Sequence, residues 1–165
     1  MPADVQIHEM TAVDAGVDKT SAIVRFKSAD ETTVNTANRL QIPAADTNYS
    51  YTKQLRAYFN SAPSIDIQDI RAYSDGSNDF GTGIGVQYDV SGLFAPNIDT
   101  DIAGTDFFTK TSVASIDMDA VNTGPHTGTG YKGDFLRIQM TVHHDASPGS
   151  LAALAEPLTV AYDET

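Results

Sequence analysis

The stretch that decides the fold class is residues 51–90, YTKQLRAYFNSAPSIDIQDIRAYSDGSNDFGTGIGVQYDV. In its first part the apolar residues Leu55, Ala57 and Phe59 alternate with polar ones, the period of two that places successive side chains on opposite faces of a strand. Alternation resumes at 65–73 and at 84–90, after an Ala-Pro-Ser break and a loop rich in Asp, Asn and Gly. The stretch therefore predicts three strands joined by two turns.

Further alternating segments lie on both sides of this unit. The whole chain predicts strands at 5–10, 22–27, 40–43, 51–59, 65–73, 84–90, 113–118, 134–143 and 158–162. In the 134–143 strand, Leu136 and Ile138 are expected to face the core, and Arg137 and Gln139 to face the solvent. The sequence also predicts a turn at 145–149 and at most one helical turn at 151–155.

Length and strand number together predict the architecture. A chain of 165 residues is long enough for one domain with a substantial core and short for two. Many short strands separated by turn residues, without a long helix, are typical of antiparallel sandwiches. We predict a single all-β domain over residues 1–165, a β-sandwich or jelly-roll of about seven to nine antiparallel strands. Residues 91–131 are expected to form an irregular excursion within it.

The charge balance is the most unusual bulk property. Twenty-two acidic residues against ten basic ones give a formal net charge of −12, and the acids are spread along the chain. A dispersed acidic surface disfavours nucleic-acid binding, because phosphate contacts require clustered Lys and Arg. The charge serves either solubility through self-repulsion or life at high salt, where ions screen that repulsion.

Other classes are excluded by composition. Cysteine is absent, which rules out disulfides and thiolate metal sites. No apolar run approaches the roughly 18–20 residues of a membrane helix, and the first residues lack the pattern of a signal peptide. We expect a soluble protein without a membrane segment or an export signal.

Five stretches in a fixed order resemble a group of small proteins encoded by tailed viruses of bacteria and archaea. They are RFK near residue 25, NYSYTKQLRAYFNSAP at 48–63, IRAYSDGSNDFGTGIGV at 70–86, GDFLRIQMTVHHDASPG at 133–149 and AYDE at 161–164. The relatives carry S-Y-x-K, T-A-P, I-x-N-I-x-x-Y-x-D-G, G-T-G-V, A-x-P-G and a terminal Y-D-E. The likeness is most specific at 73–83 and 161–164. This chain has Asp69 where the relatives have Asn, and 91–131 matches no pattern of the group.

The resemblance implies a structural role in a virus particle. The expected role is a capsid decoration or turret protein, located in virions assembled in the host cytoplasm. Such a protein forms a homo-oligomer, with a trimer or pentamer favoured, and docks on the major capsid protein. The acidic composition would then indicate a halophilic archaeal host. A tail or head–tail connector component is the alternative within this class, and a carbohydrate-binding module for host attachment is the alternative from another class.

One loop carries a candidate metal site. Asp75 and Asp79 offer hard oxygen ligands of the kind that hold Ca²⁺. The loop lacks the twelve-residue spacing and the distal Glu of an EF-hand, and Asp-Gly and Asn-Asp are common turn residues. A plain turn is the competing interpretation. No other cofactor is predicted.

A second candidate site consists of aromatic residues in the excursion. Phe94, Phe107 and Phe108 are large apolar side chains in a stretch without a clear strand pattern. They require either the core of the chain or a neighbouring subunit to be buried. They are therefore candidate interface residues.

Enzymatic chemistry is not predicted. The glycines at 81–85 match neither a dinucleotide fingerprint nor a Walker A loop, and there is no G-x-S-x-G elbow. The four histidines, including the pair His143 and His144, give no ordered triad, and a surface position of that pair beside Asp145 is the simpler interpretation. Asn48 begins an N-x-S triplet, a possible glycosylation site.

Overall fold

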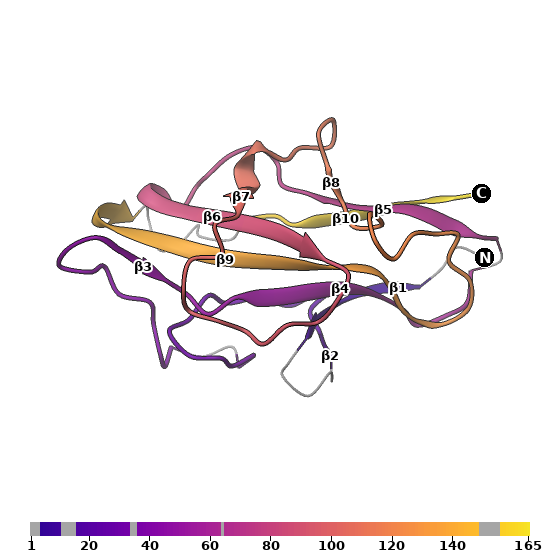
Figure 1. Ribbon diagram of the computed structural model, residues 1–165, viewed down its shortest axis with the longest axis horizontal. Coiled ribbons are helices and arrows are strands. Elements are labelled where there is room, and N and C mark those ends of the chain that lie inside the picture. Colours follow the sequence, from indigo (N-terminus) through magenta and orange to yellow (C-terminus); the bar gives the residue numbers. More distant parts are fainter. Residues whose placement is uncertain (1–3, 11–15, 34–35, 64, 149–155) are drawn as a thin grey trace.

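The computed structural model describes residues 4–10, 16–33, 36–63, 65–148 and 156–165. Within these ranges the protein is all-β, with two antiparallel sheets that share one core (Figure 1). The predicted sandwich-like fold class is thereby confirmed. The described residues contain no helix beyond the single 3-10 turn η1 (Phe107–Thr109).

The large sheet has seven strands, in the order β2-β1-β4-β9-β6-β7 with β3 paired to β9. Its strands are β1 (Val5–Met10), β2 (Gly16–Asp18), β3 (Thr47–Tyr49), β4 (Lys53–Phe59), β6 (Gly81–Ser91), β7 (Thr105–Asp106) and β9 (Gly130–Pro148). The small sheet has the order β10-β5-β8. It consists of β5 (Ile67–Tyr73), β8 (Ile116–Asp117) and β10 (Thr159–Glu164).

The core forms between the two sheets from the alternating residues that define the strands. Leu55, Ala57 and Phe59 of β4 are at most 1% exposed, and Leu136 of β9 is fully buried. The small sheet contributes Ile67, Ile70 and Ala72 of β5. Burial of each large aliphatic or aromatic side chain stabilises the fold by about 1.5–3 kcal/mol, so this face holds the sheets together.

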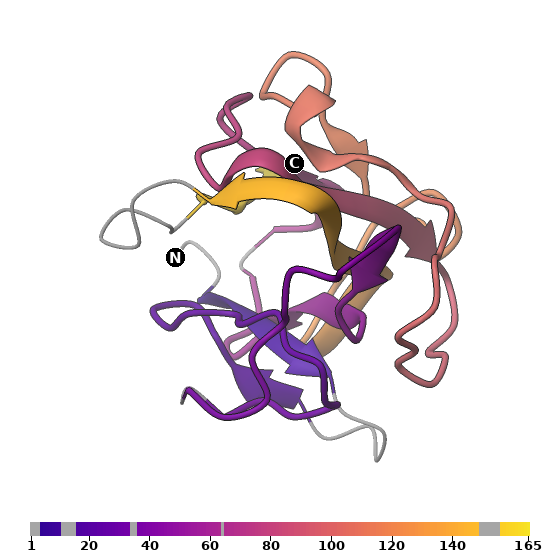
Figure 2. The same ribbon diagram turned by 90° about the vertical axis from the view of Figure 1, so that its left-hand side faces the viewer.

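Two predicted strands are absent. Residues 22–27 and 40–43 are not strands; the nearest pairing is an isolated bridge from Lys27 to Arg39, just before the second segment. β2 pairs with the edge of β1, so segment 22–27 cannot pair with β1. Val24 and Phe26 nevertheless pack on the core, as their alternation indicated. In Figure 2 the indigo and violet segments that precede β4 lie opposite the salmon segment around η1.

The predicted turn at 145–149 is also wrong for its described part. β9 continues as a strand to Pro148, because the start of β6 provides a partner there: Gly81 pairs with Pro148 and Thr82 with Ser147. The register shifts between Thr82 and Ile84, at Gly83 with a φ of +74°. A Cβ at Gly83 would lie 2.8 Å from the Ala146 Cα, so this position requires glycine. The helical turn predicted at 151–155 lies outside the described residues.

A buried charge cluster attaches the segment after β2 to the end of the core. The Glu9 carboxylate lies 2.9 Å from Lys53 Nζ and 3.4 Å from Lys19 Nζ, and these side chains are at most 4% exposed. Lys53 Nζ also donates to the carbonyl of Glu31, and Lys27 pairs with the Glu31 carboxylate at 2.5 Å. Removal of one partner from such a buried pair leaves an uncompensated charge, so the cluster fixes this segment on the sheet.

Candidate functional site

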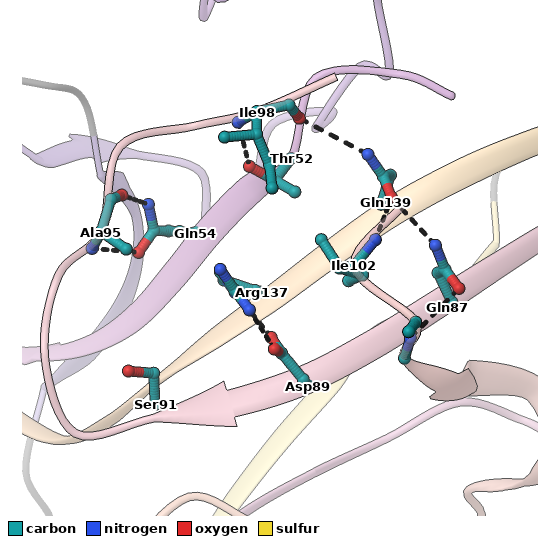
Figure 3. A network of polar contacts seen from close by, with 12 residues as sticks. Thr52, Gln54, Gln87, Asp89, Ser91, Ala95, Ile98, Ile102, Arg137 and Gln139 are labelled. Atoms are coloured by element: carbon teal, nitrogen blue, oxygen red, sulfur yellow. Dashed lines mark hydrogen bonds and ion pairs between the residues drawn. The ribbon is translucent and has the colours of Figure 1, made fainter. Parts of the chain in front are cut away.

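The outer face of the large sheet is covered by residues 92–104, a segment without regular structure. Gln54 of β4 and Gln139 of β9 lie beneath it and are fully buried, which contradicts the prediction that Gln139 faces solvent. Figure 3 shows both side chains extended from their strands toward this segment. We call Gln54, Gln87 and Gln139 the glutamine layer.

The glutamine layer supplies hydrogen bonds that the covering segment cannot make itself. Gln139 Nε2 donates to the carbonyls of Ser50 (2.8 Å) and Thr100 (3.0 Å), and its Oε1 accepts from the Ile102 amide (3.3 Å). Gln87 Nε2 donates to Gln139 Oε1 at 2.9 Å. Buried backbone groups need hydrogen-bond partners, and the side-chain amides of the glutamine layer supply them to residues 92–104 as a neighbouring strand would.

The same pattern repeats at the other end of the segment. Gln54 Nε2 donates to the Ala95 carbonyl and to Asn97 Oδ1, and Gln54 Oε1 accepts from the Ala95 amide. Thr52 pairs with Ile98 twice, through its amide (2.8 Å) and its hydroxyl (3.0 Å). Residues 92–104 are therefore held on the sheet by hydrogen bonds at several points along the segment.

An ion pair completes this face. Arg137 of β9 and Asp89 of β6 form two hydrogen bonds side by side, one of them at 2.7 Å (Figure 3). The bonds to Asp89 raise the pKa of Arg137. Arg137 points away from the core, as predicted, but it does not face open solvent: its side chain is 19% exposed and is paired with Asp89 on the neighbouring strand.

A hollow of about 380 Å³ opens where the excursion meets the chain around β3. It is lined by Ser28, Arg39, Leu40, Gln41, Thr47, Asn48, Tyr49 and Asp99. Asp99 belongs to the excursion, and the other residues lie between 28 and 49. We call this hollow the Arg39–Asp99 pocket.

Local contacts fix the walls of the Arg39–Asp99 pocket. The Tyr49 hydroxyl donates to Asp101 at 3.3 Å, and Asn48 Nδ2 donates to the Gln41 carbonyl at 2.9 Å. Burial, together with the Asp101 charge, raises the pKa of Tyr49, so its hydroxyl stays neutral. The Gln87 hydrogen bond is the main cause that lowers the pKa of Asp101. The glutamine layer and the pocket therefore share a hydrogen-bond network.

A second hollow, of about 470 Å³, follows the edge of β6 beyond the end of β7. The chain leaves this edge after Asp106 to place Phe107 and Phe108 in the core. Asn78 Nδ2 donates to the Ile84 carbonyl at 2.7 Å and so caps part of the edge. Asp106 is the one charged residue that lines this hollow, whereas the Arg39–Asp99 pocket is lined by one basic and one acidic residue.

The predicted calcium loop is a turn in this structure. Asp75 Oδ1 accepts from the Ser77 amide at 2.9 Å, and the Asp79 amide donates to the Glu156 carboxylate. Burial is the main cause that raises the pKa of Glu156, and the negative charges of Asp79 and Asp75 raise it further. The described residues include no group of three or more His, Cys, Asp or Glu side chains placed to hold a metal. Calcium binding by Asp75 and Asp79 stays a prediction.

The three predicted interface aromatics separate into two environments. Phe107 and Phe108 are 4% and 8% exposed and pack in the core of the chain itself, with Phe108 against Phe80. Phe94 is half-buried against Phe135, with ring centroids 5.9 Å apart. Phe107 and Phe108 thus follow the core alternative, and only Phe94 lies near the surface.

Sequence reasoning missed the apolar residues that are exposed. Leu93 and Val121 are 79% and 68% exposed. A Cβ at Gly92 would lie 2.6 Å from Val121 Cγ1, which places Val121 directly beside the residue that precedes Leu93. Asn122 Nδ2 donates to the Gly92 carbonyl at 2.9 Å and ties the two loops together. We call this pair the Leu93–Val121 patch.

The histidines have separate local partners. His143 bonds to Asp145 on the surface, as predicted for the pair. His126 bonds to Asp119 at 2.8 Å, and His8 stacks on Tyr58 with centroids 4.5 Å apart. No ordered catalytic set is formed by these side chains.

Comparison with known proteins adds no relative. No family model, no curated protein and no solved structure matches the chain. In the part that the structure describes, no helix has the length and apolar character needed to cross a membrane.

Proposed function

We propose that the protein is a structural component of a tailed-virus particle, most directly a capsid decoration or turret protein that self-associates and docks on the capsid. The observation that carries this proposal is the Leu93–Val121 patch. Leu93 and Val121 are exposed apolar residues on a chain with a net charge of −12. The two loops that carry them meet at Gly92, where Val121 approaches the backbone and Asn122 donates a hydrogen bond. Exposed apolar groups of this kind are buried when subunits assemble.

The resemblance to virion proteins supports the same role. Its two most specific stretches, 73–83 and 161–164, join the ends of β5 and β10. Tyr73 pairs with Thr159, and Arg71 forms two hydrogen bonds with Asp163, at 2.8 and 3.0 Å. Each of these pairs joins one residue of a specific stretch, Tyr73 or Asp163, to a residue of the partner strand, so the stretches contribute to the pairing of β5 with β10.

The occupant of the patch is a second copy of this chain. Each copy carries a charge of −12, so association is opposed at low ionic strength and favoured where salt screens the repulsion. Self-association is therefore expected to rise with salt. This dependence agrees with a particle assembled at high ionic strength.

The test is the solution mass of the wild type and of Leu93→Asp, measured by light scattering after size exclusion in molar salt. A trimer or pentamer of the wild type and a monomer of Leu93→Asp are expected, since a buried charge without a partner is costly at an interface. Val113→Asp is the matched control, because Val113 is 95% exposed and lies outside the patch.

The other outcomes are equally informative. A ring of six or more copies would favour a tail or connector component. A wild type that stays monomeric in molar salt, or a Leu93→Asp variant with the wild-type mass, would overturn assembly through the Leu93–Val121 patch.

A further inference from the structure

The Arg39–Asp99 pocket contains polar groups that the protein itself does not use. Arg39 Nε donates to the Thr36 carbonyl at 3.0 Å. Within the described residues, the two terminal nitrogens of Arg39 have no hydrogen-bond partner. The Asp99 carboxylate likewise forms no hydrogen bond or ion pair with any described residue. Charged groups facing one hollow without partners are available to a ligand.

The remaining lining groups define the chemistry of that ligand. The side-chain carbonyls of Gln41 and Asn48 accept hydrogen bonds, and the Thr47 hydroxyl donates and accepts. The Ser28 hydroxyl donates to the Asn38 carbonyl and can accept from a ligand, and Tyr49 adds an aromatic ring. A ligand that suits this set has many groups that both donate and accept, together with a small apolar face. Pyranose sugars have this combination, with hydroxyls around the ring and C–H groups on one face.

The pocket is also built before a ligand arrives. Asp99 follows Ile98, which Thr52 holds through two hydrogen bonds, and Tyr49 is fixed by Asp101. The backbone around Asp99 and the Tyr49 side chain therefore lose little conformational freedom on binding, which favours affinity. The hollow has a volume of about 380 Å³ and is open to solvent on one side, so a bound ligand keeps part of its surface in water.

From these observations we infer that the Arg39–Asp99 pocket binds a neutral hexopyranoside. Asp99 and the two amide carbonyls accept from sugar hydroxyls, Arg39 donates to them, and Tyr49 packs against the ring. The net charge of −12 selects against acidic sugars, because a negative ligand is repelled by the whole protein. This binding activity goes beyond the structural role and does not depend on it.

The test is a titration of the labelled full-length protein with three neutral probes, followed by amide correlation spectra at constant salt. The probes are methyl α-D-mannopyranoside, methyl β-D-galactopyranoside and methyl β-D-glucopyranoside, each up to about 50 mM, the range of weak binding. At least one probe is expected to give saturable shifts centred on the amides of Gln41, Asn48, Tyr49 and Asp99.

Matched variants separate the pocket from the rest of the surface. Arg39→Ala and Asp99→Ala are expected to weaken binding at least tenfold. Arg25→Ala and Asp66→Ala alter exposed residues outside the pocket and are expected to leave it unchanged. The spectra of the free variants report whether each one is folded, so a loss of binding is not confused with a loss of structure.

Four results would overturn the inference. The first three are the absence of saturable shifts with all three probes, shifts centred elsewhere, and binding that survives Asp99→Ala unchanged. Tighter binding of N-acetylneuraminic acid than of the neutral probes would also overturn it, since Arg39 would then act as an anion site. The assembly state is measured separately, so failure here leaves the Leu93–Val121 proposal standing.

Discussion

The two faces of the large sheet are built by the same strands and are covered in opposite ways. On one face Leu55 and Leu136 pack against the small sheet, and on the other Gln54 and Gln139 lie under the 92–104 segment. All four side chains are at most 1% exposed. The kind of side chain that is buried therefore depends on the layer that covers it. A second sheet has already paired its own backbone N–H and C=O groups, so apolar side chains can pack against it. An irregular segment has not, so polar side chains must supply hydrogen-bond partners.

Among the substitutions that test this comparison, the largest loss of unfolding free energy is expected on the apolar face. Phe59→Ala removes a fully buried ring and is expected to lower the free energy of unfolding by about 3–5 kcal/mol. Phe94→Ala is the matched variant on the other face, where the ring is half-buried, and a smaller loss is expected. Denaturant unfolding at constant salt measures both. Equal losses would contradict the assignment of the core to one face.

The next effect concerns the glutamine layer. Gln139→Leu keeps the side-chain volume but leaves the Ile102 amide and the Ser50 carbonyl without partners, at an expected cost of about 1–3 kcal/mol. Gln68→Leu on β5 is the control, with an expected change within about 0.5 kcal/mol. A Gln139→Leu variant as stable as the wild type would show that the layer contributes packing alone.

The smallest effect on stability is expected at Glu31, in the charge cluster at the end of the core face. The Lys27 bond, followed by those from Thr33 and Asn38, lowers the pKa of Glu31 to about 2 from its usual 4.5. A lowered pKa in the folded state means that the stabilisation is fully present above pH 4.5 and is lost as the pH falls toward 2.

Glu31→Gln measures this contribution. Unfolding experiments from neutral pH down to about 3 are expected to show a stability gap to the wild type that narrows as the pH falls. Asp66→Asn serves as a surface control without such a gap. A gap that is constant over the whole pH range would mean that the Glu31 charge does not contribute.

The alternation of apolar and polar residues predicts the long strands that pair with another long strand. β4, β5, β6 and β9 were predicted because one face of each strand is apolar, and that face meets the core. β2, β3 and β7 were missed because strands of two or three residues show no period. Their positions depend on which sheet edges are free, which only the folded chain reveals.

The candidate sites could be predicted less well. Phe107 and Phe108 are apolar residues in an irregular stretch, and their burial depends on the turn at η1 that points them inward. Gln139 has the alternation of a solvent-facing residue, and nothing in its own strand shows that residues 92–104 fold over it. Likewise, Arg39 and Asp99 lie sixty residues apart in the sequence, so the pocket depends on tertiary structure.

The glutamine layer connects the two proposals, because the segment that it holds carries both Leu93 and Asp99. The most direct test of this account is amide hydrogen exchange of Ile98 and Ile102, compared with the amides of β4 and β9. The account predicts protection close to that of the strands, although the segment has no regular structure. Exchange as fast as in an unprotected loop would contradict it, because the patch and the pocket would then have no fixed support.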